Sequence, residues 1–317
     1  MSNFLLVYNT CGISNKENCD WYIQGLQSLL DQNFDNKHIV MSSCLNSQTD
    51  RQKIQQHFGS SISYSLIDNK VPVNITFNHT VQQCEEHIGR FDGHIYIDSG
   101  VIFDSPNIIS EINNLYNNGK YGIVTIPTNS DTGFEHWFGK SFPFDDHFIM
   151  PIGKACNAHV NCFDRGVFDA YNQRIWPDIF ASCCSESVYS FLAASINKKW
   201  IIHKDLCVPH HISVDGGSSG FPNTPLEWDR EQRPVWDHVI GTKTMRQIIA
   251  DPEAWNCGFG YEEVAQVFIH NPQCYENGLC SDPNRLLDFI KNNLFVSENI
   301  YKELKYTFIH NNKNTEV

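Results

Sequence analysis

Short apolar runs alternate with longer amphipathic segments over the first two-thirds of the chain. Runs rich in β-prone residues predict strands, and apolar residues that recur every three or four positions predict helices. The expected strands are Asn3–Tyr8, Lys37–Ser43, Val71–Phe77, Gly93–Asp98, Tyr121–Pro127, Phe148–Gly153, Asn157–Phe163 and Lys199–Lys204. The expected helices are Tyr22–Leu30, Asn46–Phe58, Thr80–Ile88, Asn107–Tyr116 and Glu186–Ile196. This order predicts an α/β fold with a mixed, mostly parallel, Rossmann-like sheet flanked by helices.

The pattern changes near Val214. A stretch rich in Gly, Ser and Pro follows, which is typical of a mobile loop. Two amphipathic segments, Asn284–Asn293 and Glu298–Phe308, then predict helices. We therefore expect a first domain over residues 1–215, and a flexible loop with a mainly helical C-terminal extension over residues 216–317.

Charge and hydropathy narrow the classes of partner. The 317 residues carry a formal net charge of −13, and an acidic chain of this kind is not expected to bind nucleic acid, which requires clustered Lys and Arg. The first residues lack the basic start of a signal peptide, and no segment approaches the roughly 18–20 apolar residues of a transmembrane helix. The 12 cysteines are scattered without a C-x-x-C pair, as in proteins of reducing compartments. We expect a cytoplasmic protein.

Polar residues follow several of the expected strands. The tails are Asn9-Thr10-Cys11, Ser42-Ser43-Cys44, Phe77-Asn78-His79 and Asp98-Ser99-Gly100. In open α/β sheets, ligands bind outside the carboxyl ends of the strands. These four tails therefore predict one shared pocket.

Asp98 is the most informative of these residues. A carboxylate at the end of a buried strand can hold a divalent cation, and the small Ser99 and Gly100 would let a diphosphate approach the backbone. The competing interpretation is a turn aspartate that accepts hydrogen bonds from its own backbone.

Two further carboxylates are candidates for a general base. Glu186 lies at or near the start of an expected helix among apolar and thiol residues, where desolvation would raise its pKa. An acidic residue is equally suited to that position because it offsets the helix dipole. Asp178 lies a few residues earlier and is a second candidate.

A pair of histidines, His210-His211, follows the last expected strand. Either could bind a metal or contact a phosphate. Because side chains alternate along an extended segment, we expect only one to point inward. Two partly exposed loop histidines are the alternative.

Aromatic and acidic residues are interleaved in the segment from Gly133 to Phe148. Trp137, Asp145 and Asp146 would suit an acceptor sugar, because flat aromatic faces and carboxylates are common in such sites. The alternative is a loop whose aromatic residues pack onto the sheet.

In this order, the motifs resemble the GT-A glycosyltransferases, specifically the inverting, family-2-like members. The opening "LVYNTCGISNKENCDWYIQGLQSLLDQNF" is similar to that family's first strand, polar turn and helix. "HIVMSSCLNS", "FNHTVQQC" and "IGRFDGHIYIDSG" are similar to its second strand, its Asn-containing helix start and its D-x-D strand. The likeness extends over about residues 1–220 and includes the helix of Glu186.

The resemblance implies transfer of a sugar from a nucleoside diphosphate donor to the hydroxyl of a glycan or other acceptor, with Mn²⁺ or Mg²⁺ as cofactor. Asp98, with His210 or His211, would hold the metal. The residues that would bind the donor are Thr10, Ser43, Asn78, Asp98, Ser99 and Gly100. Glu186, or Asp178, would be the base.

The chain departs from the family at two places. Gly100 stands where the second Asp of the D-x-D is found, which leaves one carboxylate for a metal, and Ser42-Ser43 replaces an acidic pair that contacts the nucleobase. Two other interpretations stay open: a GT-A-fold carbohydrate-binding protein that has lost its chemistry, and a nucleotidyltransferase-like enzyme. The latter usually carries a basic, Gly-rich loop after the first strand, where this chain has one Gly and Lys16.

Overall fold

The computed structural model describes most of the first two-thirds of the chain and the C-terminal end. The described residues are 2–11, 16–44, 48–68, 73–129, 142–144, 147–149, 159–176, 189–211, 291, 301–302, 304–311 and 313–316.

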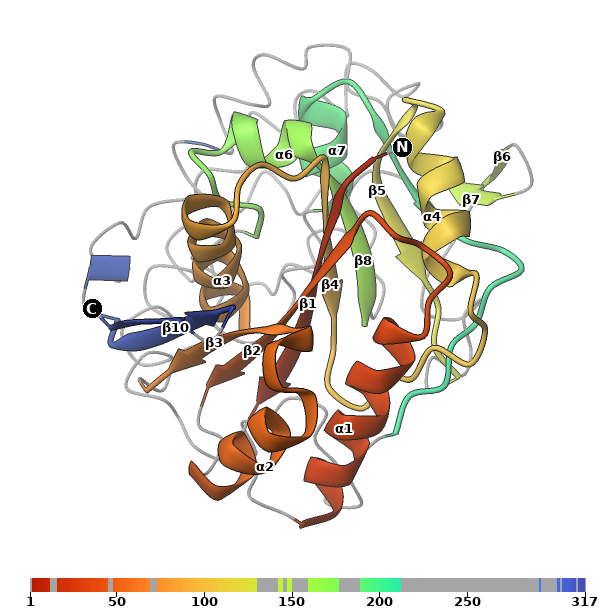
Figure 1. The fold of residues 1–317 in the computed structure, drawn as a ribbon. Coiled ribbons are helices and arrows are strands. Elements are labelled where there is room, and N and C mark those ends of the chain that lie inside the picture. The colour runs from red at the N-terminus through yellow and green to blue at the C-terminus, as the bar shows by residue number, and fades with distance from the viewer. Residues whose placement is uncertain are drawn as a thin grey trace, which may run out of the picture.

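Strands and helices alternate through the first part of this structure (Figure 1). The strands are β1 (Phe4–Cys11), β2 (Lys37–Cys44), β3 (Ser63–Ile67), β4 (Gly93–Ile97), β5 (Tyr121–Ile126), β6 (Phe142–Phe144), β7 (His147–Ile149), β8 (Val160–Asp164), β9 (Lys199–Ile202), β10 (Tyr306–His310) and β11 (Lys313–Glu316). The α-helices are α1 (Lys16–Leu30), α2 (Gln48–Phe58), α3 (Val73–His87), α4 (Ile108–Asn117), α6 (Arg165–Ala170) and α7 (Tyr189–Ser195), with a 3-10 turn, η1 (Gly59–Ser61), after α2.

Within the described ranges the strands form one 11-stranded sheet in the order β11-β10-β3-β2-β1-β4-β8-β5-β9-β7-β6. β1 is parallel to β2 and β4, β2 is parallel to β3, and β5 is parallel to β9. β8 lies between β4 and β5 and is antiparallel to both. The carboxyl ends of β1 to β5 therefore lie at the same edge of the sheet as the beginning of β8. The mixed, mostly parallel sheet predicted from the sequence is confirmed.

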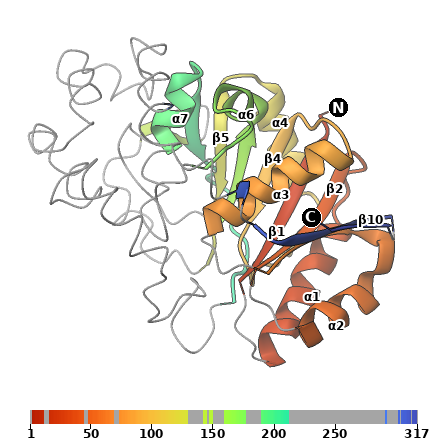
Figure 2. The same ribbon diagram turned by 90° about the vertical axis from the view of Figure 1, so that its left-hand side faces the viewer.

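Alternating side chains of the central strands form two apolar layers. Phe4, Leu6 and Tyr8 of β1 belong to a core cluster with Leu26 of α1, and the same cluster includes residues of α2 and α4. On the other face Phe77 of α3 packs against residues of β4 and β8, including Tyr96 and Phe163. In Figure 2, α1 and α2 lie on one side of the strands and α7 on the other.

The expected third strand over residues 71–77 is wrong. Helix α3 begins at Val73, and the third strand is β3, over Ser63–Ile67. Residues 74–81 of α3 are all buried, so this part of the helix has no exposed face to set a helical period. In β3, Ser63 and Ser65 are buried although they are polar. Because polar residues occupy buried positions in both α3 and β3, the pattern of hydrophobic residues does not predict either element.

The C-terminal end also differs from the helix expected over residues 298–308. Residues 301–302 are helical, but Tyr306–His310 is strand β10, which pairs antiparallel with β3 and with β11. Figure 1 shows β10 in blue beside β3. Leu304 and Phe308 are both buried, and their spacing of four imitates a helical face. The division at residues 215/216 stays a prediction, and the helix expected over 284–293 lies almost wholly outside the described residues.

No helix in the described part of the chain is long and apolar enough to cross a membrane. Cys19, Cys84, Cys162 and Cys207 form no disulfide bond in the described part of the chain.

Candidate active site

Three side chains from separate parts of the chain meet at the carboxyl edge of the sheet. Asp98 directly follows β4, and His159 directly precedes β8. The register that pairs Ile97 with Val160 continues outward, because the backbone N–H of Asp98 donates to the carbonyl of His159 at 2.8 Å. His210 lies in an extended segment and forms an isolated β-bridge with Val101.

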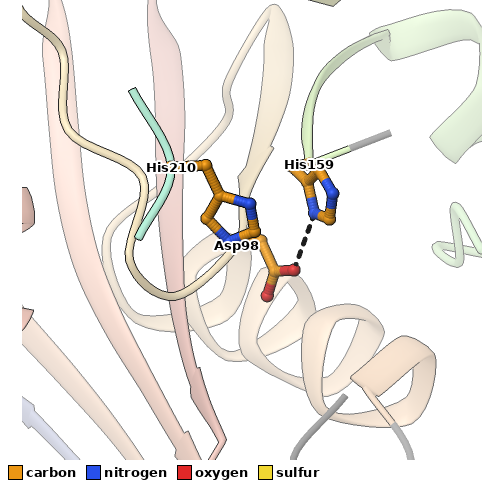
Figure 3. A group of neighbouring side chains, drawn as sticks. All are labelled: Asp98, His159 and His210. Carbon is orange, nitrogen blue, oxygen red and sulfur yellow. Dashed lines mark hydrogen bonds and ion pairs between the residues drawn. The ribbon is translucent and has the colours of Figure 1, made fainter. Parts of the chain in front are cut away.

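The side chains of Asp98, His159 and His210 form a compact group, shown in Figure 3. Nδ1 of His159 lies 3.0 Å from Oδ2 of Asp98, and the two imidazole rings are 4.2 Å apart between centroids. The side chains of Asp98 and His159 are 13% and 14% exposed, and His210 is buried. The group is therefore largely shielded from water.

Hydrogen bonds fix the orientation of both rings. Nε2 of His210 lies 3.0 Å from the carbonyl oxygen of Ser99, which can only accept, so the ring proton is on Nε2 and Nδ1 carries a lone pair. Nδ1 of His159 donates to Oδ2 of Asp98, and a cation bound to both atoms would take the place of this proton. Metal-binding histidines commonly donate their second N–H to a carbonyl, as His210 does to Ser99.

The group has the composition of a cation site. One ligand atom from each of Asp98, His159 and His210 can be chosen so that all three lie within 4.8 Å of one another. Two imidazole nitrogens and one carboxylate oxygen are ligands that a transition-metal cation accepts. These residues fit the divalent cation that the sequence predicts, with His159 as a ligand that was not foreseen.

The turn after Asp98 is tightly determined. The backbone N–H of Ser99 donates to Oδ1 of Asp98 at 2.9 Å, and that of Gly100 donates to the hydroxyl of Tyr8 at 3.0 Å. Gly100 has a φ of +84°, and a β-carbon there would overlap the carbonyl oxygen of His211. A second aspartate therefore does not fit at position 100 with this backbone.

Tyr8 supports this turn from inside the sheet. Burial raises the pKa of its phenol well above the usual range, although the hydrogen bond from Gly100 opposes the shift. The phenol thus stays protonated and neutral at physiological pH. Its role is to accept the N–H of Gly100, which would otherwise be buried without a partner.

Only one histidine of the pair belongs to the group, as the alternation of side chains predicts. His211 is exposed, and its ring stacks on Trp21 of α1 with centroids 5.3 Å apart. Its backbone N–H donates to the carbonyl of Gly100 at 2.9 Å. His211 therefore anchors the segment, while His210 points inward.

The other donor-binding candidates are engaged by the protein. Oγ1 of Thr10 donates to the carbonyl of Ser42 at 3.0 Å, and Oγ of Ser43 accepts from Nε of Arg51 at 3.3 Å. Both lie within the last two residues of neighbouring parallel strands, β1 and β2. Their contact with a donor stays a prediction.

Asn78 lies in the interior of α3 and not at a strand end. Its Oδ1 accepts the backbone N–H groups of Ile175 and Trp176, each at 2.9 Å. Its Nδ2 donates to the carbonyl of Trp176 at 2.6 Å and to the hydroxyl of Tyr301 at 3.0 Å. All four contacts tie α3 to other parts of the chain, which gives Asn78 a structural role.

His159 is a candidate metal ligand that the sequence did not predict. It stands immediately before a buried strand in "NAHVNCF", and a residue at the start of a parallel strand would lie at the opposite edge of the sheet. The antiparallel direction of β8 reverses that expectation. The candidates Trp137, Asp145, Asp146, Asp178 and Glu186 lie outside the described residues.

Comparison with known proteins gives structural matches only. No protein-family model and no curated protein sequence matches the chain. The crystal structure of S. aureus TarS residues 1–349 matches with a TM-score of 0.50 and 10% identity, covering 99% of this chain and 96% of that chain. The mannosyltransferase PcManGT from Pyrobaculum calidifontis, in complex with GDP-Man and Mn²⁺, matches with a TM-score of 0.49 and 10% identity, covering 94% and 88%.

An identity of 10% carries information about architecture alone, and the match to TarS extends over nearly the whole of both chains. The chain has the GT-A type of α/β fold that its sequence predicts.

Proposed function

We propose that this protein is a glycosyltransferase that moves a sugar from a nucleoside diphosphate sugar to an acceptor hydroxyl. The observation that carries the proposal is the group of Asp98, His159 and His210 at the carboxyl edge of a GT-A sheet. That edge is where α/β sheets bind their ligands. A carboxylate with two oriented imidazoles is suited to a cation that is shared with a diphosphate.

Asp98, His159 and His210 would hold the divalent cation. When bound, such a cation stabilises the negative charge of the departing diphosphate. The carbonyl of Ser99 would hold the ring of His210 in place. The burial of these groups excludes water and strengthens their electrostatic interactions.

The ligand set favours Mn²⁺ over Mg²⁺. Mg²⁺ prefers oxygen ligands in a near-ideal octahedron, whereas imidazole nitrogen suits transition metals. Two of the three ligands are histidines. We therefore propose that activity is higher with Mn²⁺ than with Mg²⁺.

An inverting displacement needs a group that removes the proton of the attacking hydroxyl. We propose Glu186 for this role, with Asp178 as the second candidate, on the resemblance of the sequence to GT-A enzymes. Trp137, Asp145 and Asp146 are proposed to contact the acceptor on the same basis.

The glycine at position 100 is not an argument for a carbohydrate-binding protein that has lost catalytic activity. Its positive φ and the nearby carbonyl of His211 give the glycine a backbone reason, and the two histidines supply ligands that a second aspartate would otherwise provide. The single carboxylate is thus compatible with an intact metal site.

The proposal is tested by donor turnover. Purified protein is incubated with a panel of UDP- and GDP-sugars in Mn²⁺, in Mg²⁺ or in EDTA, and release of nucleoside diphosphate is measured. At least one donor is expected to turn over in Mn²⁺. Asp98→Asn and His159→Gln are expected to lower kcat/KM roughly 100-fold, because they remove electrostatic stabilisation from the transition state.

The matched control is His57→Gln on the exposed side of α2, which should keep wild-type turnover and melting temperature. Turnover of no donor by the wild type, or wild-type turnover by Asp98→Asn, would contradict the proposal.

A further inference from the structure

Asn9 follows Tyr8 in β1, and its side-chain amide is buried. The residue is 2% exposed, and its carboxamide oxygen, Oδ1, accepts no hydrogen bond within the described structure. The neighbouring polar side chains at this edge are paired: Thr10 donates to a carbonyl, and Ser42 forms a hydrogen bond with Thr80 at 2.8 Å. A buried polar atom without a partner is unfavourable and calls for an explanation, such as a ligand, an ion or a water.

The sheet register places Asn9 beside the candidate metal ligands. β1 pairs Tyr8 with Ile97, and β8 pairs Ile97 with Val160. These three residues belong to one core cluster and so point to one face of the sheet. Because side chains alternate along a strand, the next residues outward, Asn9, Asp98 and His159, all turn to the opposite face.

Continued one residue past its last pair, Tyr8 with Ile97, the β1–β4 register sets Asn9 opposite Asp98. Adjacent strands are separated by about 4.8 Å, so both side chains leave the sheet at the same level and in the same direction. On the far side of Asp98 lies His159, whose carbonyl accepts the N–H of Asp98. This register places Asn9, Asp98 and His159 in a row at the ends of three adjacent strands, β1, β4 and β8.

We propose that the carboxamide oxygen of Asn9 is a further ligand of the cation at Asp98, His159 and His210, reached directly or through a cation-bound water. This inference rests on the proposed metal site. Carboxamide oxygens are ordinary ligands of hard and borderline divalent cations. Position 100 has no room for a second acidic side chain, and Asn9 supplies an oxygen to the same site from the neighbouring strand.

The test is calorimetric titration of the metal-free full-length protein with Mn²⁺ alone. Asn9→Leu is expected to weaken Mn²⁺ binding roughly 10–100-fold, the range found for residues that support metal ligands. Its melting temperature without metal should be unchanged or higher, because an apolar side chain replaces an unpartnered amide. Asn9→Asp should tighten Mn²⁺ binding by roughly tenfold, since a carboxylate adds charge to the site.

The outcomes separate this inference from the proposed function. Loss of Mn²⁺ binding in Asp98→Asn, together with wild-type binding in Asn9→Leu, would overturn the role of Asn9 and leave the metal site in place. A defect of Asn9→Leu in UDP or GDP binding alone would also overturn it, because Asn9 would then contact the donor. No Mn²⁺ binding by the wild type would overturn both. If Asn9→Leu fails to fold, Asn9→Asp decides: tighter binding supports the inference, and unchanged or weaker binding contradicts it.

Discussion

Gly100 lies at the third position of the motif Asp98-Ser99-Gly100, with a φ of +84° and the carbonyl of His211 close by. Left-handed backbone of this kind is costly for any residue with a β-carbon. From the sequence alone, the glycine reads as the loss of an acidic metal ligand. The structure shows that the backbone conformation at position 100 requires a glycine. Two histidines join Asp98 in the group where a second aspartate would otherwise be expected.

Gly100→Ala is therefore expected to lower the free energy of unfolding by roughly 2–4 kcal/mol, from backbone strain and steric overlap together. Gly119→Ala is the matched control, because Gly119 also has a positive φ, of +73°, but no atom near a β-carbon. Gly119→Ala should lower the free energy of unfolding by only about 1 kcal/mol. Urea unfolding of both variants measures the difference, and equal losses would show that the carbonyl of His211 can move aside.

Helix α3 and strand β10 show how packing between elements overrides local pattern. α3 is buried along most of its length, and β10 packs against its histidines: His79 contacts Tyr306 at 4.4 Å, and His87 stacks on Phe308 at 5.1 Å, both between ring centroids. The sequence predicted β2, β4, β5 and α4 within a few residues, because their apolar runs or faces are intact. It missed β3, in which two buried positions are serines, and β10, where the spacing of Leu304 and Phe308 imitates a helical face.

The contact between α3 and β10 should be sensitive to acid through His79. Burial lowers the pKa of His79 from 6.5 to about 4. The unfolded chain therefore binds a proton as the pH falls below about 6.5, while the folded chain does not until the pH nears 4, so folding stability decreases over this interval. Between pH 7.5 and pH 5, the titration of His79 should lower the free energy of unfolding by about 2 kcal/mol.

Urea unfolding at both pH values measures this effect. On acidification, the free energy of unfolding of His79→Gln should fall by about 2 kcal/mol less than that of the wild type. The variant has no group that titrates at this position. The same acid loss in His79→Gln as in the wild type would contradict the expectation.

In the whole molecule, the candidate site emerges from the topology of the sheet. Asp98 and His210 could be predicted, because each is a polar residue after an expected strand. His159 could not, since its position depends on the antiparallel direction of β8. Asn9 was recognisable as part of a polar tail, but its place beside Asp98 depends on the register of β1 with β4.

The central claim is that Asp98, His159 and His210 bind a metal that is shared with the diphosphate of the donor. The most direct measurement is a crystal structure with Mn²⁺ and UDP or GDP, using anomalous scattering at the manganese absorption edge. We predict an anomalous peak within bonding distance of all three side chains, with the diphosphate in contact with the same ion. Manganese at another place, or a nucleotide bound away from the carboxyl ends of β1 and β4, would contradict the account.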